Sequence, residues 1–256
     1  MFNNNEFYIL ILNIAFVNGM YLDELSTFEF RDKLKNNPKT VIILPLGAVE
    51  EHGEHLPLST DSIQPEYVAS TIAKESELDI LIAPPIRYGI CETARNFSGT
   101  INLSFNTFKT FIQEILCELC RHGVKNIVVL SGHAGRVHMA ALRVAGGEVV
   151  EKFDVNLMVL SDYDIIYKLA GKEFPEWDGH AGSVETSRIM AISPELVKGK
   201  GKRSKVEFPS YRILRNPEDY FPSGVMGDPE AATTETGKKM NRLVIDELKR
   251  LIAEMV

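Results

Sequence analysis

The sequence predicts an α/β domain in which a mostly parallel sheet is covered by helices on both faces. Four short apolar runs are typical of strands that are buried on both sides, at residues 40–46, 79–84, 126–130 and 155–160. Segments with helical periodicity alternate with these runs, which favours parallel strands. The chain has 256 residues, enough for one large domain or two small ones, and its 45% of hydrophobic residues can supply a full core.

Each element has its own local signal. The first strand ends at Pro45, and Pro84 stops the second. Ser26 and Glu29 have the spacing of a capping box, either inside the first helix or at its start. Residues 87–106 are irregular and contain glycines, so we expect an active-site loop there. Helices are expected at residues 22–34, 62–77, 108–121 and 137–153.

The cysteines do not indicate redox chemistry. Cys117 and Cys120 form a C-x-x-C pattern, but it lies within an expected helix rather than at a helix start. We therefore expect both to be thiols of the core. The odd total of three cysteines does not match the disulfide framework of a secreted protein. We therefore expect this protein to be cytoplasmic.

Residues 1–19 are expected to be an extension before a single domain of residues 20–256, and Met20 is a candidate for the native start. The apolar run at residues 7–17 lacks a positively charged flank and is too short to span a bilayer. The formal net charge of −7 argues against non-specific binding of nucleic acid, which needs clustered basic residues. The expected partner is a small molecule, with neither nucleic acid nor membrane.

The loop after the first strand is rich in side chains that can bind a metal. Open α/β sheets place their chemistry outside the carboxyl ends of the strands. Imidazole mixed with carboxylate suits zinc, manganese or Fe(II), and a loop without thiolates argues against a structural zinc site. A charged surface loop with hydrogen-bonded histidines is the alternative interpretation. Four candidate ligands lie within twelve residues, namely Glu50, His52, His55 and Asp61.

Two further segments favour the metal site over the surface loop. His133 directly follows the third strand, so it should reach the same edge of the sheet as Glu50 and His52. His180 lies in the second of two Gly-His-Ala-Gly sequences, and Glu185 begins a helix soon after it. The small residues around His180 let the backbone approach a ligand closely.

Five motifs follow one another at residues 45–61, 97–101, 131–133, 180–187 and 224–229. In this order they resemble the motifs of the creatininase (creatinine amidohydrolase) family, over nearly the whole chain from Met20. The resemblance implies a three-layer α/β/α domain and a homo-oligomer. It also implies hydrolysis of small cyclic amides or amide-like C–N bonds at a dinuclear metal centre.

By position, the resemblance implies a metal ligand set with Asp61 as the bridging carboxylate. Creatininase has a further glutamate where this chain has Gly135, so the second metal is either less fully bound or completed by Glu185. His180 and Glu185 are our candidates for the catalytic acid/base, and the alternative role of His180 is to orient a metal ligand. The implied ligands of one or two divalent metals are Glu50, His52, Asp61 and His133.

A second departure from the family is Ala94, where many relatives carry histidine. These departures, with the Ile- and Lys-rich composition, resemble the archaeal branch that releases formate from a formamidopyrimidine ribonucleotide in flavin and deazaflavin cofactor synthesis. That branch implies a phosphorylated pyrimidine nucleotide as substrate and a preference for Fe(II), with zinc or manganese as alternatives. Arg95 and Trp177 are our candidate substrate contacts.

Several assignments stay open at this level. The basic run at residues 198–205 is either a solvated loop or a grip for a substrate phosphate. His55 either orients its loop or binds metal, and Asp228 is expected to cap a turn. Creatinine hydrolysis and the trimming of a modified peptide are alternative activities, and a metal-binding regulatory module is the non-enzymatic alternative.

Overall fold

The structure, a computed structural model, describes residues 20–256, so the expected extension at residues 1–19 lies outside the described part. Five short 3-10 helices add single turns, at Leu22–Glu24, Gly171–Glu173, Pro194–Leu196, Pro217–Tyr220 and Pro229–Ala231. The main elements are α2 (Thr27–Asn36), β1 (Val41–Leu46), α3 (Thr60–Glu75), β2 (Ile80–Ile82), α4 (Phe105–Arg121), β3 (Asn126–Ser131), α5 (Arg136–Val150), β4 (Asn156–Ser161), α6 (Asp162–Ala170), α7 (Ser183–Ile192) and α8 (Thr234–Met255).

The four strands form one parallel sheet in the order β2-β1-β3-β4. The register pairs Leu46 with Ser131, and Ser131 with Ser161, so β1, β3 and β4 end level with one another. This arrangement confirms the predicted α/β class. Segments that follow these strands therefore begin at one edge of the sheet.

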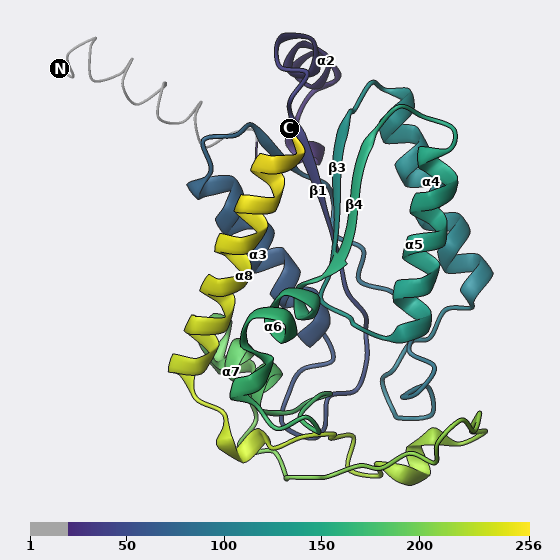
Figure 1. Ribbon diagram of the computed structural model, residues 1–256, viewed down its shortest axis with the longest axis vertical. Coiled ribbons are helices and arrows are strands. Elements are labelled where there is room, and N and C mark those ends of the chain that lie inside the picture. The colour runs from purple at the N-terminus through teal and green to yellow at the C-terminus, as the bar shows by residue number, and fades with distance from the viewer. Residues whose placement is uncertain (1–19) are drawn as a thin grey trace, which may run out of the picture.

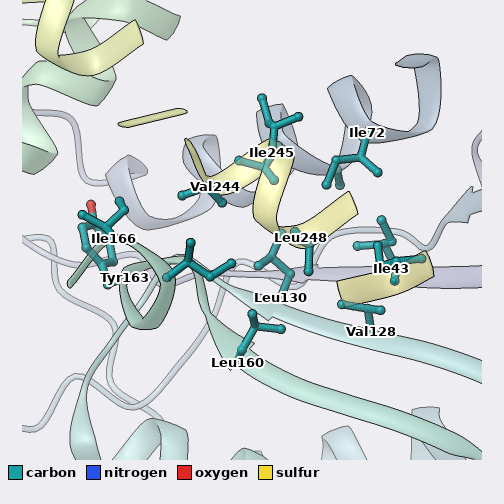
Figure 2. Packing of buried hydrophobic residues seen from close by; sticks show 14 of the residues in the cluster. Ile43, Ile72, Val128, Leu130, Leu160, Tyr163, Ile166, Val244, Ile245 and Leu248 are labelled. Carbon is teal, nitrogen blue, oxygen red and sulfur yellow. The ribbon is translucent and has the colours of Figure 1, made fainter. Parts of the chain in front are cut away.

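Both faces of the sheet are covered by helices, which gives the three layers visible in Figure 1. Because successive side chains of a strand point to opposite faces, Ile43 and Ile42 enter different cores. Ile43 packs with residues of α3, α6 and α8, including Ile72 and Leu248 (Figure 2). Ile42 belongs to the core on the side of α4 and α5.

The four strands lie where the apolar runs predicted them, and β1, β2 and β3 are buried along their length. The expectation of burial on both sides is wrong for β4, an edge strand whose residues 156–159 are exposed or only partly buried. The first helix begins later than predicted, since Ser26 is its N-cap and accepts a hydrogen bond from the Glu29 N–H at 3.3 Å. Helix α3 begins earlier than predicted, at Thr60. Asp61 therefore lies in the first turn of a helix and not in the preceding loop.

Helices α6 and α8 were not predicted. Helix α8 covers the sheet beside α3, and its buried positions Met240, Val244, Leu248 and Ile252 recur at four-residue intervals. That pattern is an amphipathic signal that the sequence does contain. Among residues 20–256, no helix is long and apolar enough to cross a membrane.

Cys117 and Cys120 are free thiols and lie half-buried against the core on the α4 side. They line the margin of that core and not its centre. This position agrees with the expectation that both cysteines pack in the core and take no part in redox chemistry. Both are, however, more exposed than a thiol at the centre of a core would be.

Candidate metal centre

The candidate ligands gather at the edge of the sheet where β1, β3 and β4 end. Glu50 and His52 follow β1, and His133 follows β3. The Gly132 N–H donates to the Leu46 carbonyl at 2.9 Å, which ties these two loops together. Asp61 approaches from the first turn of α3, and Glu185 from the first turn of α7. The predicted convergence on one sheet edge is confirmed for the position of these residues.

A first cluster consists of Glu50, Asp61 and His133. The His133 Nδ1 lies 3.2 Å from Glu50 Oε2 and 3.0 Å from Asp61 Oδ2. Both carboxylate oxygens are buried and, apart from these contacts with the imidazole, have no hydrogen-bond partner among residues 20–256. The opposite ring nitrogen, Nε2, donates to the Ile90 carbonyl at 3.0 Å. This hydrogen bond orients the imidazole with Nδ1 toward the carboxylates, as in metal sites whose histidines are held from behind.

A second cluster consists of His52, Asp61 and Glu185, whose ligand atoms lie within 4.8 Å of one another. The His52 Nε2 is 3.1 Å from Asp61 Oδ1 and 3.4 Å from Glu185 Oε2. The His52 Nδ1–H donates to the Glu50 carbonyl at 3.1 Å, so Nε2 faces the carboxylates. Asp61 thus directs one oxygen into each cluster. Glu185 is the third residue of the second cluster, and Gly135, where the related enzyme has a glutamate, lies against the His133 ring.

The charges in the two clusters are strongly coupled. Burial alone opposes ionisation of these side chains, but Asp61 and the other carboxylates raise the pKa of His52 to about 10. At His133, burial lowers the pKa, but Glu50 and Asp61 raise it well above its usual value. At Asp61, burial raises the pKa, but His52 and His133 lower it overall. The carboxylates therefore require positive charge. Divalent metals would supply it in place of the imidazole protons, and the unpartnered oxygens fit that role.

His180 lies beside both clusters and is held by Glu51. The His180 Nε2–H donates to Glu51 Oε1 at 3.0 Å, and Glu51 Oε2 accepts the Gly53 N–H at 3.0 Å. The His180 Nδ1 is 4.0 Å from Glu50 Oε2, so this nitrogen faces the site. Burial and the neighbouring His52 lower the pKa of His180, but the Glu51 hydrogen bond helps to raise it overall.

Glu51 was not predicted from the sequence as a functional residue. Glu51 and Glu50 are consecutive residues and both are buried. Neither helical nor strand periodicity predicts that two consecutive side chains belong to the same site. The surroundings of Glu51 are closely built: Gly224 has a positive φ of 66°, and a Cβ there would collide with the Glu51 carboxylate. Gly224 belongs to the fifth sequence motif, which therefore makes room for Glu51.

The loop before α7 positions Glu185. The Ala181 N–H donates to Glu185 Oε2 at 2.7 Å. Ala181 has a φ of 53°, a left-handed conformation that is uncommon for residues other than glycine and typical of sites under local constraint. Burial raises the pKa of Glu185, although His52 and His180 oppose that shift.

His55 belongs to none of the candidate ligand groups in the described chain. Its Nε2 lies 2.9 Å from the hydroxyl oxygen of Thr186, and burial, with the nearby His52 and His180, lowers its pKa to about 4. Of its two expected roles, this contact supports orientation of the loop. Glu54, the residue before it, is exposed.

The predicted substrate contacts lie outside the clusters. Arg95 is exposed and donates to the Arg215 carbonyl at 3.2 Å. The Trp177 ring lies under the Arg203 guanidinium, with 4.9 Å between the Arg203 Cζ and the ring centroid. Arg203 is part of the basic run at residues 198–205, so the structure joins two features that the sequence left separate.

Asp228 is the N-cap residue of the 3-10 helix Pro229–Ala231, as expected of a residue that caps a turn, but its carboxylate makes no capping hydrogen bond to the described residues. Its N–H donates to Asp178 Oδ1 at 3.0 Å, and its carboxylate lies 3.7 Å from Arg203. Asp178 is the residue that caps: it accepts the Ser183 N–H at 2.9 Å and the Val184 N–H at 3.3 Å, both at the start of α7. The Asp178 carboxylate thereby satisfies N–H groups next to Glu185.

Known proteins resemble this chain in sequence. The family described as creatinine amidohydrolase matches residues 23–252. The creatinine amidohydrolase of Pseudomonas putida is 28% identical over 92% of this chain and 97% of its own length. The mycofactocin precursor peptide peptidase of Mycobacterium ulcerans is 30% identical over 83% of this chain and 84% of its own length.

Solved structures agree with the sequence comparison. A crystal structure of creatinine amidohydrolase superposes with a TM-score of 0.80 at 26% identity, over 92% of this chain and 97% of that one. A manganese form of creatininase gives a TM-score of 0.80, and a zinc–zinc form of a mutant gives 0.79, both at 25% identity over 92% of this chain and 98% of theirs. The chain belongs to the creatininase family of hydrolases that act on carbon–nitrogen bonds.

Proposed function

We propose that this protein hydrolyses the formamide bond of a phosphorylated formamidopyrimidine ribonucleotide and releases formate. The observation that carries the hydrolytic part is the placement of Asp61, which directs one oxygen into each of two ligand clusters. When bound, a pair of divalent metals lowers the pKa of water toward neutrality and polarises a carbonyl group. Fe(II) is our proposed native metal, with zinc or manganese as alternatives.

The chain's own residues would handle the proton of the leaving amine. His180 Nδ1 faces the clusters, and its Nε2 proton is held by Glu51. A buried imidazole that is fixed in one tautomer can deliver or accept a proton at a defined position. Glu185 is bound by the Ala181 N–H and lies beside His52, which supports a role in the second cluster over that of acid/base.

Recognition of a phosphate rests on the basic run at residues 198–205. The Lys198 N–H donates to the His55 carbonyl at 2.7 Å, and a Cβ on Gly201 would lie 2.6 Å from the His55 ring. The run therefore contacts His55, which follows His52 closely in the same loop. Its basic side chains can attract a phosphate, and the contact of Arg203 with the Trp177 ring brings the proposed substrate contact Trp177 to this run.

The test is anaerobic reconstitution of the metal-free protein with Fe(II), manganese or zinc, followed by assays of formate release from the ribonucleotide and its dephosphorylated form. We expect metal-dependent formate release that is faster for the phosphorylated compound. Equal turnover of both compounds would remove the basic run from substrate recognition. No formate from either compound, with metal bound, would contradict the proposed substrate.

A second candidate function is the trimming of a modified peptide. It is favoured by the 30% identity to a mycofactocin precursor peptide peptidase. Parallel assays with a peptide substrate and with creatinine distinguish these activities from formamide hydrolysis. The His180→Ala variant addresses the non-enzymatic alternative: an enzyme should lose turnover and keep its metal, while a regulatory metal-binding module has no turnover to lose.

A further inference from the structure

Cys91 lies in the irregular segment between β2 and α4, and its side chain is almost fully buried, at 1% exposure. Its Sγ, a carboxylate oxygen of Glu50 and a ring nitrogen of His133 all lie within 4.8 Å of one another. The sulfur thus lies beside two residues of the first ligand cluster, Glu50 and His133. From the sequence alone, Cys91 had no assigned role.

The backbone around Cys91 is anchored on both sides. The Cys91 N–H donates to Asn102 Oδ1 at 2.8 Å, and its carbonyl accepts the Ala94 N–H at 3.2 Å. The preceding residue, Ile90, accepts the His133 Nε2–H through its carbonyl. Two consecutive residues therefore contact the cluster: Ile90 holds the imidazole through its carbonyl, and Cys91 places its sulfur near His133 and Glu50.

His138 strengthens this arrangement. The Ile90 N–H donates to His138 Nδ1 at 3.3 Å, so the His138 Nε2–H can donate to Ser131 Oγ, 3.1 Å away. The Ser131 hydroxyl in turn donates to the His133 carbonyl at 2.8 Å. This chain of hydrogen bonds links the loop after β3 to residues 90 and 91, which fixes the position of the sulfur relative to His133.

A second, independent observation points to a cation at the same place. Glu50 is 3% exposed, and in the described part of the chain its Oε2 has no hydrogen-bond partner although it lies 3.2 Å from His133 Nδ1. The Asp61 Oδ2 in the same cluster is also buried without a partner. Unpartnered buried carboxylate oxygens are costly unless a cation neutralises them.

We infer that Cys91 provides a sulfur ligand to the metal held by Glu50, Asp61 and His133, and thereby selects the metal at this site. On binding, the S–H bond breaks, a sulfur–metal bond forms and the proton is released to solvent. Thiolate favours zinc and Fe(II) over manganese or magnesium, which prefer oxygen. The second cluster has no sulfur, so the two sites should differ in their metal preference. The inference rests on the metal dependence in the proposed function.

The first test uses the full chain loaded with Co(II). The wild-type protein should show a thiolate-to-cobalt charge-transfer band in the near ultraviolet, and Cys91→Ser should lack it. Cys117→Ser and Cys120→Ser are matched controls, because these thiols lie away from the clusters, and both variants should keep the band. Competition between zinc and manganese should show a loss of zinc affinity of at least about tenfold in Cys91→Ser, with manganese affinity changed less.

A second measurement needs no variant, so a folding defect of Cys91→Ser cannot obscure the answer. Zinc X-ray absorption of the wild-type protein should show a sulfur neighbour at about 2.3 Å. Bound metal with only nitrogen and oxygen neighbours, or a cobalt band that survives in Cys91→Ser, would overturn the inference and leave the proposed function intact. A folded wild-type protein that binds no metal would instead contradict the proposed function itself.

Discussion

At the scale of single residues, Asp61 is the side chain on which both clusters depend. Its two oxygens face different imidazoles, His133 and His52, at 3.0 and 3.1 Å. Glu185, by contrast, approaches only the second cluster. The two carboxylates should therefore differ in how many metals their removal affects.

We expect Asp61→Asn to abolish binding of both metals, because each cluster loses an anionic oxygen. Glu185→Gln should lose the second metal and keep the first. The measurement is the metal-to-protein ratio by elemental analysis after gel filtration, with circular dichroism as the control for folding. Equal metal content in the two variants would contradict the bridging position of Asp61.

The environment of His55 predicts how the stability of the protein depends on pH. Burial lowers the pKa of His55 to about 4 from the ordinary value of 6.5, so the folded protein resists protonation that the unfolded chain accepts. His55 therefore contributes stability that is present above about pH 6.5 and is lost as the pH falls toward 4. We expect His55→Gln, which keeps a polar partner for Thr186, to show a smaller loss of stability between these limits. Urea unfolding at several pH values gives the change of the free energy of unfolding with pH for the wild-type protein and for His55→Gln. An identical pH dependence in the two proteins would exclude this contribution of His55.

The sequence allowed the candidate ligands to be named singly, because each follows a strand or begins a helix. It did not show that Glu51, Cys91 and His138 join them. The positions of these three depend on irregular backbone, such as the hydrogen bond from Cys91 to Asn102, which no periodic pattern encodes. Glu185 was foreseen as a substitute for the glutamate missing at Gly135, and its approach to His52 is compatible with that expectation.

At the scale of elements, a buried ion pair joins three helices beneath the site. Arg188 of α7 lies 2.7 Å from Asp162 of α6, and both side chains are fully buried. The Arg188 Nε–H also donates to Asn241 of α8 at 2.8 Å. Since Arg188 is on the same helix as Glu185, the pair fixes the helix that carries this candidate ligand.

We expect Arg188→Met to reduce the free energy of unfolding by about 3–5 kcal/mol, because Asp162 would remain buried without its partner. A matched control is Arg242→Met: Arg242 pairs with Glu75 at 2.8 Å but is partly exposed, and its loss should cost no more than about 1 kcal/mol. Urea denaturation measures both values. The double variant Arg188→Met with Asp162→Leu should recover much of the loss, and an equally large loss would contradict this explanation.

Element boundaries show where sequence patterns lose information. The start of α3 was misplaced because its N-cap, Ser59, makes no side-chain capping hydrogen bond. The Thr60 hydroxyl instead donates to the Pro57 carbonyl at 2.7 Å. The first helix shows the opposite case, since the Ser26–Glu29 capping box is present and marks its true start.

At the scale of the whole molecule, the connection between α7 and α8 runs along the end where the strands finish (Figure 1). It carries Tyr211 and Ile213, both fully exposed. Large apolar side chains that are close together and fully exposed are typical of a contact with another protein surface. This connection is the part of the chain that we expect to take part in the proposed homo-oligomer.

We expect the wild-type protein to be oligomeric, and the double variant Tyr211→Ser with Ile213→Ser to have a lower mass in solution. Phe28→Ser is the control, because Phe28 is an exposed aromatic residue on α2, at the opposite end of β1. Light scattering coupled to gel filtration gives the masses. A monomeric wild-type protein, or an unchanged mass in the double variant, would contradict the prediction.

The distance in sequence between the cluster residues has a consequence for folding. Glu50, His133 and Glu185 lie far apart in the sequence, after β1, after β3 and in the first turn of α7, and come together in the folded domain. A metal held in either cluster would join distant segments and act as a cross-link that closes long loops of the chain, and in the unfolded protein that closure is entropically unfavourable. The ion would therefore bind almost exclusively to the native state. At a free concentration a hundred times its dissociation constant, it would add about 2.7 kcal/mol to the free energy of unfolding. Loss of the metal would then weaken the cohesion of the domain as well as its chemistry.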